Sequence, residues 1–335
     1  MTSGRAQSGV GRRLVALTAL LLGCSTQTLD AGSDVPRGLL PVDERNPVIL
    51  SNDGTGDWFG LYAILFANTG GPRLAAITVN SSSYAEDLDE NLAAWRELVD
   101  AARASGLQNI PDPTASIGPP LVRPSSGEIA ATVPNASQGA RSIVEVSAQL
   151  GSAARPVVIA VGGRLTDVAD AYLLDPTVAE RVVVVAALGS VVANGDALMG
   201  APNGELDPWA DAIVARRFRY VQVSSFYDAT ADLPAAELAD LPVTPLRELV
   251  AELQPNITDT YTRADQVAVL AAALPGFVVD VERAVPETTT APDPLSGPRL
   301  LSSEDEGIWL VTGIAPATAG AALRSMLRDP ATYGD

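Results

Sequence analysis

The chain has 335 residues, of which 40 are acidic and 22 are basic, so its formal net charge at neutral pH is −18. This negative charge disfavours nucleic acids and anionic membrane surfaces as partners. The sequence contains one cysteine and no histidine. An intramolecular disulfide is therefore excluded, and any chemistry must use carboxylates, hydroxyls and backbone groups.

The N-terminal residues have the pattern of a secretory signal. Three arginines precede the apolar run Leu14–Leu22, which is too short to span a bilayer. The run ends in Leu21-Leu22-Gly23-Cys24-Ser25, which resembles a bacterial lipobox, where a signal peptidase cuts before a diacylated cysteine. We predict a lipoprotein signal peptide over residues 1–23 and lipidation of Cys24. The alternative is an ordinary secreted protein in which Cys24 happens to end the apolar run.

Cleavage at this point would leave a lipid-anchored envelope protein. The formal charge would move from −18 to −21, because three arginines and no acids are lost. The acyl chains would then hold the protein at the membrane. Residues 24–46 are polar and lack periodicity, which predicts a flexible tether, and residues 47–335 suit one large domain. Ser25 after the cysteine resembles outer-membrane lipoproteins, so we expect the chain at the outer membrane, facing the periplasm.

The first element of that domain is an apolar strand from Pro47 that runs into a turn broken by Gly54 and Gly56. A run with helical character follows, from Phe59 to Phe66. Asp53 and Asp57 would lie at the carboxyl end of the strand, the edge where open parallel α/β sheets bind ligands. Local pattern alone also allows both to cap the following helix.

Short β-favouring runs and helical stretches then alternate to the end of the chain. Several of the runs are apolar on both faces, which is typical of parallel strands covered by helices. The fold class is therefore α/β. Further strands are expected at Leu74–Val79, Val157–Val161, Val182–Ala187, Tyr220–Ser224, Phe277–Val281 and Ile308–Thr312, helices at Ala85–Ser105 and Ala317–Leu327, and irregular proline-rich connections at Ile110–Asn135 and Val285–Pro298.

Four segments together resemble the inosine-uridine-preferring nucleoside hydrolase family. The turn Ser51–Trp58 resembles the family's opening Asp-x-Asp-x-x-x-Asp-Asp motif. Pro120–Pro124, Gly163–Ala169 and Glu205–Asp211 resemble later family segments in the same order. The resemblance implies a nucleoside-hydrolase-like fold, an open, mostly parallel Rossmann-like sheet flanked by helices.

The resemblance also implies a calcium site. Asp53 matches a family residue that is both a calcium ligand and the general base, which would take a proton from a calcium-bound water. Asp57 matches a ribose-binding acid, or a calcium ligand if the turn has lost one residue, and both registers stay open. The backbone carbonyl of Gly162 and the carboxylate of Asp265 match further calcium ligands. Oxygen donors of these kinds suit Ca²⁺.

Glu205 and Asp207 match the family segment that contacts ribose. Negative groups there would stabilise an oxocarbenium-like sugar. The alternative is an ordinary solvated helix start, in which Asp207 caps a helix that begins with Pro208. We expect Asp167 and Asp211 to be hydrogen-bonding groups local to their helices, and Trp95 to be a core residue.

Two functions remain open. The first is an envelope-anchored, Ca²⁺-dependent enzyme that hydrolyses the N-glycosidic bond of a ribonucleoside, or a related ribosyl compound, to base and ribose. The second is a catalytically impaired pseudoenzyme or ligand-binding lipoprotein on the same fold. The residues that favour the second are Ser51, Trp58, Ala264 and Asp207, because the family has acids, a histidine or an asparagine at these positions. Family members are commonly dimers or tetramers, so the resemblance implies a homo-oligomer.

Overall fold

The structure is a computed structural model that describes residues 40–43, 45–54, 64, 73–82, 85–188, 203–223, 242–253, 278–286, 300–303, 307–314, 325 and 328. Among the residues given a functional interpretation above, Cys24, Asp57, Trp58, Ala264 and Asp265 lie outside these ranges. Apart from single positions, so do the helices expected at Phe59–Phe66 and Ala317–Leu327.

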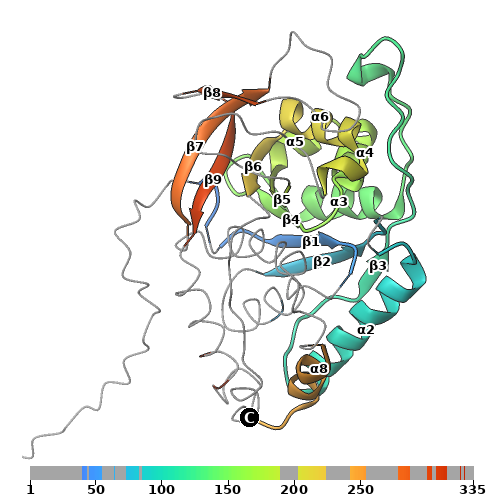
Figure 1. Cartoon of the computed structure of the whole chain (residues 1–335), viewed down its shortest axis with the longest axis vertical. Helices are drawn as coiled ribbons and strands as arrows, with labels where there is room; N and C mark the ends of the chain where they lie inside the picture. The colour runs from blue at the N-terminus through green and yellow to red at the C-terminus, as the bar shows by residue number, and fades with distance from the viewer. Residues whose placement is uncertain are drawn as a thin grey trace, which may run out of the picture. The chain divides into compact units, whose positions relative to one another are not determined.

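Most of the described strands form a parallel sheet (Figure 1). The order across the nine-stranded sheet is β3-β2-β1-β4-β5-β6-β9-β7-β8, and every neighbouring pair from β3 to β9 is parallel. This arrangement confirms the predicted fold class. The parallel strands are β1 (Val48–Asn52), β2 (Leu74–Val79), β3 (Pro113–Ala115), β4 (Val157–Val161), β5 (Val182–Ala187), β6 (Arg219–Val223) and β9 (Ile308–Ile314).

The C-terminal edge of the sheet is antiparallel, which the sequence did not predict. β7 (Val278–Pro286) pairs antiparallel with both β9 and β8 (Leu300–Ser303). The expected strand Phe277–Val281 therefore extends to Pro286, and Val285 belongs to a strand rather than to a connection. β7 carries the exposed Asp280 and the partly exposed Glu282 and Arg283, as an antiparallel strand with one open face can.

Helices flank the sheet, and α2, α3 and α6 each begin after a residue whose side chain caps the helix. Asp87 caps α2 by accepting hydrogen bonds from the backbone N–H groups of Asp89 and Glu90, and Ser137 caps α3 by accepting one from Ala140. The described helices are α2 (Leu88–Ala104), α3 (Gln138–Leu150), α4 (Thr166–Leu174), α5 (Val178–Arg181), α6 (Pro208–Arg217) and α8 (Pro245–Leu253).

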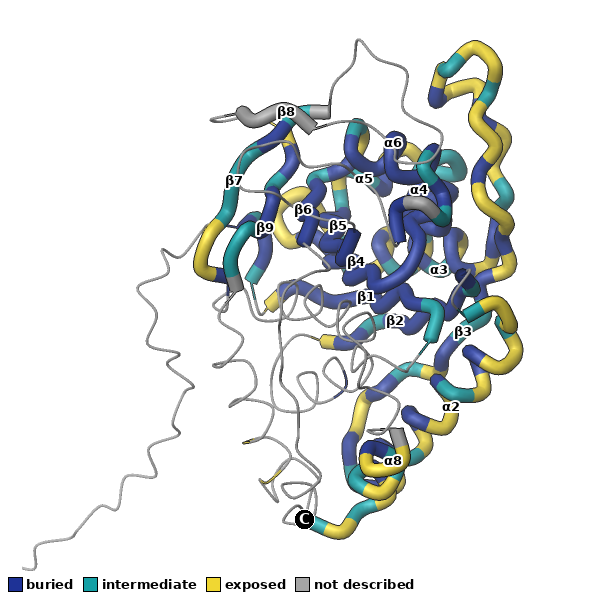
Figure 2. Tube along the Cα trace, in the orientation of Figure 1, coloured by how far each residue is buried: buried dark blue, intermediate teal, exposed yellow. Residues whose placement is uncertain are grey.

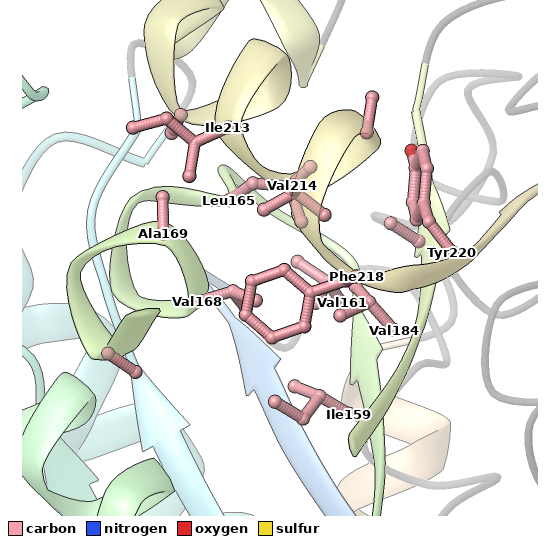
Figure 3. Close-up of a cluster of buried hydrophobic side chains, with 14 of the residues drawn as sticks. Ile159, Val161, Leu165, Val168, Ala169, Val184, Ile213, Val214, Phe218 and Tyr220 are labelled. Carbon is pink, nitrogen blue, oxygen red and sulfur yellow. The ribbon is translucent and has the colours of Figure 1, made fainter. Parts of the chain in front are cut away.

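The core lies between the central strands and the helices α4 and α6 (Figure 3). Ile159 and Val184 of the sheet face Val168 of α4 and Phe218 at the end of α6, and all but Phe218 are completely buried. The strands β1, β4 and β5 are buried along their whole length (Figure 2). Trp95 is also fully buried, as predicted. The sheet interior therefore fixes where its strand ends lie.

The connection between β3 and α3 follows the helical layer beside α4 and α6. The sequence predicted irregular structure over Ile110–Asn135, but the chain here contributes the edge strand β3 and a short 3₁₀ turn, Ile129–Ala131. We call residues 116–137 the β3–α3 loop. Within the described ranges, no helix is long and apolar enough to cross a membrane.

Candidate functional site

The carboxyl ends of β1, β2 and β4 meet at one edge of the sheet. The backbone N–H of Asn80 donates to Asn52 O (2.9 Å), and that of Gly162 donates to Ser51 O (2.9 Å). These two hydrogen bonds align the carboxyl ends of β1, β2 and β4 with one another. We call this group of residues the β1 edge site: Ser51, Asn52, Asp53, Asn80, Gly162 and Gly163.

Buried polar atoms without partners gather at this edge. Asn52 is completely buried and Asn80 is 1% exposed. The Oδ1 of Asn52, and both Oδ1 and Nδ2 of Asn80, form no hydrogen bond with any described residue, and neither does the hydroxyl of Ser51. A buried polar group that lacks a partner costs about 1–3 kcal/mol. Such a concentration of unpaired groups is typical of a site that a ligand or water completes.

Gly163 allows these amides to approach the backbone closely. A Cβ atom at this position would lie 3.1 Å from Asn80 Oδ1 and 3.8 Å from Asn52 Oδ1. It would also lie 3.5 Å from the backbone nitrogen of Asp53. The two amide oxygens and the start of the Asp53 turn therefore surround one point beside Gly163.

Asp53 is the acidic side chain of this edge in the described structure. It follows β1 directly and is partly exposed. Its Oδ1 accepts a hydrogen bond from the backbone N–H of Gly54 (2.7 Å), and Asn52 Nδ2 donates to Gly54 O (2.8 Å). The structure thus places Ser51 and Asn52 inside β1, and the turn begins at Asp53. Asp53 keeps one carboxylate oxygen free of described protein donors.

Asn203 connects the β1 edge site to the segment that contains Glu205. Its Nδ2 donates to Gly162 O (2.7 Å) and to Ala187 O (2.9 Å), which ties the start of the 3₁₀ turn Gly204–Leu206 to the ends of β4 and β5. Asn203 was not predicted as a site residue, because a single asparagine beside a glycine carries no recognisable sequence pattern. The backbone of the predicted ribose-binding segment therefore begins beside the predicted calcium-binding carbonyl.

Asp207 has a structural role in addition to its predicted ribose contact, which remains a prediction. Its Oδ1 accepts from the Ala210 N–H (3.0 Å), so it caps α6 ahead of Pro208. Its Oδ2 accepts from the Leu121 N–H (2.8 Å) and the Thr166 hydroxyl (2.7 Å). The alternative interpretation as a helix start is confirmed in its capping, but the residue is 1% exposed rather than solvated.

Asp167 and Asp170 of α4 fasten the β3–α3 loop. Asp167 Oδ1 accepts hydrogen bonds from the hydroxyls of Ser116 and Ser137. Asp170 accepts from the backbone N–H groups of Ala136 (3.1 Å) and Ser137 (2.8 Å). The prediction that Asp167 bonds locally within its helix was wrong, because its partners come from two distant segments. The sequence around Asp167 cannot reveal these partners, because Ser116 and Ser137 lie 51 and 30 residues away.

A single guanidinium accompanies these buried carboxyls in the described structure. Arg164, 8% exposed, donates to Gly118 O (2.6 Å). Burial raises the pKa of Asp167 and of Asp207, while their hydrogen bonds and the Arg164 charge act in the opposite direction. We call Arg164, Asp167, Asp170 and Asp207 the buried aspartate network.

Asp211 lies one helical turn beyond Asp207 and is completely buried. Neither of its carboxyl oxygens has a hydrogen-bond partner among described residues, so the prediction of a helix-local bond was wrong here too. Burial, together with the charge of Asp207, raises the pKa of Asp211 well above its ordinary value. Burial and Asp211 likewise raise the pKa of Tyr220. A neutral, protonated Asp211 is the state that such surroundings favour.

The donor atoms at the β1 edge site are chemically suited to a hard cation. Asp53 offers a carboxylate, Gly162 a carbonyl, and Asn52 and Asn80 offer amide oxygens without protein partners. Ca²⁺ binds oxygen ligands of all three kinds. The described residues contain no cluster of three acidic, histidine or cysteine side chains that could hold a metal. A calcium ion here would therefore depend on neutral oxygens and on Asp57 and Asp265, which lie outside the described residues.

Several solved structures of nucleoside hydrolases match this chain in fold. The inosine-uridine preferring nucleoside hydrolase from Bacillus anthracis matches with a TM-score of 0.60 at 15% identity, covering 84% of this chain and 99% of that one. An inosine-guanosine nucleoside hydrolase matches with a TM-score of 0.60 at 18% identity, with the same coverages. A purine-preferring ribonucleoside hydrolase from Gardnerella vaginalis has a TM-score of 0.60 at 14% identity, covering 85% of this chain and 99% of that one.

These matches establish a nucleoside-hydrolase-like fold. No protein-family model matches the sequence, and no curated protein matches it. At identities this low the likeness concerns the fold alone. Function must therefore be argued from the side chains of the site.

Proposed function

We propose that the protein hydrolyses the N-glycosidic bond of a ribonucleoside, or a related ribosyl compound, to a base and ribose. The observation that carries this proposal is the β1 edge site within a nucleoside-hydrolase-like fold. There Asp53, a partly exposed carboxylate, follows the buried Asn52 and lies near the buried Asn80, and the amide oxygens of both asparagines have no described protein partner. Ligands of open α/β sheets bind at such strand ends.

In this proposal Asp53 is the general base. Its free carboxylate oxygen would accept a proton from the water that attacks the anomeric carbon of the sugar. The new bond joins that water oxygen to the carbon, while the bond from the carbon to the base nitrogen breaks and its electron pair leaves with the base. The Gly54 N–H holds the other carboxylate oxygen (2.7 Å) and so orients the group.

Asp53, Asp57, the Gly162 carbonyl and Asp265 would hold Ca²⁺, as the sequence resemblance implies. When bound, the ion would supply positive charge that makes a nearby water more acidic. Asn203, which donates to Gly162 O (2.7 Å), keeps that carbonyl in a fixed position. Asp57, Glu205 and Asp207 would contact the sugar hydroxyls. Since Asp207 already accepts three hydrogen bonds, its share in sugar binding would be the smallest of the three.

The cellular setting proposed from the N-terminus is the bacterial envelope. Cys24 would carry the lipid anchor, and the tether would hold the domain at the outer membrane, facing the periplasm. We also propose a homo-oligomer, because members of the nucleoside hydrolase family that the sequence resembles are commonly dimers or tetramers. Incorporation of a radiolabelled fatty acid into the parent protein, and its loss in Cys24→Ser, tests the anchor.

A second candidate function, ligand binding without turnover, is favoured by Ser51 and Asp207. Ser51 is a neutral, completely buried residue where the resembled motif has an acid, and Asp207 is occupied as a helix cap. Both features reduce the negative charge available to a cationic transition state. The fold would then bind a nucleoside or sugar without cleaving it.

Ribose release separates the two functions. The parent protein is incubated with purine and pyrimidine ribonucleosides, with Ca²⁺ or with a chelator, and reducing sugar is measured. The proposal predicts ribose release from at least one nucleoside, reduced at least tenfold by the chelator. If no nucleoside is cleaved but calorimetry detects saturable nucleoside binding, the second function holds. If neither cleavage nor binding is found, both are wrong.

A further inference from the structure

Three arginines lie near enough for their charges to interact, although the chain is strongly acidic. Arg123 belongs to the β3–α3 loop, and Arg216 and Arg217 belong to the last turn of α6. We call these three residues the arginine cluster. None of their guanidinium groups forms an ion pair or donates a hydrogen bond to a described residue. By contrast, Arg103 pairs with Asp112 (2.8 Å) and Arg181 with Asp175 (2.9 Å).

The geometry of α6 places Arg216 on the same side of the helix as Trp209, the residue whose ring Arg123 covers. Trp209 and Arg216 are seven residues apart, so they lie on the same side of the helix, two turns apart. Long helical side chains lean toward the N-terminus of their helix, which directs Arg216 back toward Trp209. The guanidinium of Arg123 lies over the Trp209 ring, 5.4 Å from its centroid.

Aromatic rings, rather than carboxylates, hold two of these guanidinium groups. Trp209 is fixed in turn by its indole N–H, which donates to the Thr132 hydroxyl (3.0 Å). Arg217 lies over the ring of Tyr172, 5.9 Å from its centroid. An arginine that packs on a ring face keeps its N–H groups available for an acceptor. Arg123 and Arg217 are thus held in place, with hydrogen-bond donors that no described residue uses.

The electrostatics of the cluster are unfavourable without a counter-ion. Burial, and then the charges of Arg123 and Arg217, lower the pKa of Arg216. The Nε of Arg216 is buried and has no described partner. Basic residues in the last turn of a helix interact favourably with its dipole, which accounts for Arg216 and Arg217. It does not account for Arg123, which the β3–α3 loop brings in from outside the helix.

We propose that the arginine cluster binds a phosphate group. A phosphate offers several acceptor oxygens and close to two negative charges near neutral pH. Guanidinium groups bind such oxygens with paired hydrogen bonds. The net charge of −18 opposes long-range attraction of anions, so binding would depend on the short-range contacts of the cluster. The phosphate belongs either to a free small molecule or to a lipid headgroup.

Calorimetric titration of the full chain with inorganic phosphate tests the free-ligand source. Saturable binding is expected, with affinity reduced at least tenfold in Arg123→Gln and in Arg216→Gln. Arg96→Gln removes an equally charged, exposed arginine from α2 and is expected to leave the affinity within twofold of the parent. Because Arg123 is exposed, Arg123→Gln should fold even if the partly buried Arg216→Gln does not.

Flotation with vesicles tests the lipid source. Phosphatidylcholine vesicles with and without phosphatidic acid are compared, and the readout is the increase in bound protein that phosphatidic acid causes. An increase that Arg123→Gln abolishes and Arg96→Gln keeps assigns the site to a headgroup. Inorganic phosphate binding without such an increase assigns it to a soluble ligand. The proposal is overturned if neither probe binds, or if Arg96→Gln weakens binding as much as Arg123→Gln.

Discussion

The β1 edge site and the buried aspartate network differ in how their polar groups are satisfied. In the network, Asp207 accepts three hydrogen bonds and Asp170 accepts two, all from described residues, although Asp167 Oδ2 and Arg164 Nε have no described partner. At the edge site, Asn80 leaves both amide atoms without a partner although it is almost completely buried. Satisfied groups stabilise the fold, whereas unsatisfied ones cost free energy that a ligand can recover. The comparison therefore assigns stability to the network and function to the edge site.

The largest effect on stability is expected from Asp207→Ala. This change removes the cap of α6 and leaves the Leu121 N–H and Thr166 hydroxyl without an acceptor. We expect the free energy of unfolding in urea to fall by about 3 kcal/mol. Asp87→Ala, at the exposed cap of α2, is the matched control and should cost about 1 kcal/mol. Equal losses in the two variants would show that the network adds nothing beyond capping.

Gly139→Ala tests how tightly the network closes on the β3–α3 loop. A Cβ at Gly139 would lie 2.7 Å from Ser116 Oγ and 2.8 Å from Asp167 Cγ. Overpacking of this kind costs about 1–3 kcal/mol, which a thermal unfolding scan would detect as a lower Tm. Gly118→Ala, whose nearest contact would be 3.3 Å from Ser137 Cβ, should have a smaller effect. An unchanged Tm in Gly139→Ala would mean that the loop is not fastened as described.

The pH dependence of stability should report on Asp211. Its folded pKa lies well above the ordinary value of 3.8, so its contribution to stability is present below pH 3.8 and is lost as the pH rises toward the folded pKa. The free energy of unfolding should therefore decrease as the pH rises above 3.8, until the folded pKa of Asp211 is passed. Asp43 and Asp175 have lowered pKa values, so their contributions to the free energy of unfolding change mainly below pH 3.8.

Asp211→Asn, which imitates the protonated carboxyl, should reduce that slope by up to about 1.4 kcal/mol per pH unit. Urea unfolding at several pH values measures it. The stability of the variant should still decrease with rising pH, because the pKa values of Asp167 and Asp207 are also raised. An identical slope in parent and variant would mean that Asp211 is ionised in the folded protein.

The smallest effect on stability is expected from Asn80→Leu, at the edge site. Leucine has a similar volume and no polar atoms to leave unpaired, so the free energy of unfolding should stay level or rise by about 1 kcal/mol. Ligand binding should weaken in the same variant, as measured by calorimetry with a nucleoside. A loss of more than about 2 kcal/mol in stability would place Asn80 among the satisfied structural groups.

The parallel part of the fold was predictable because its strands are apolar on both faces. Leu74–Val79, Val157–Val161 and Val182–Ala187 coincide with β2, β4 and β5. β3 was missed because three residues beginning with Pro113 carry no strand pattern, and β8 because four residues beyond a proline-rich stretch carry little more. Short edge strands depend on a neighbouring strand more than on their own sequence.

The site was only partly predictable for a similar reason. Asp53 could be placed at a strand end because an apolar run leads directly into a glycine-containing turn. The roles of Asn80 and Asn203 depend on contacts between segments that are distant in the sequence. Asp207 could be recognised as a helix cap from Pro208, but not as the acceptor for Leu121, 86 residues away. Residue type and spacing give no information on such partners.

The most direct test of the central claim is ribose release by Asp53→Asn. The claim is that hydrolysis takes place at the β1 edge site with Asp53 as the base. The variant should lose about 10²- to 10⁴-fold in kcat and retain the parent's urea unfolding curve, because Asp53 is partly exposed and holds only the Gly54 N–H. Asp43→Asn, outside the site, serves as the control. Ribose release at the parent rate by a folded Asp53→Asn protein would contradict the account.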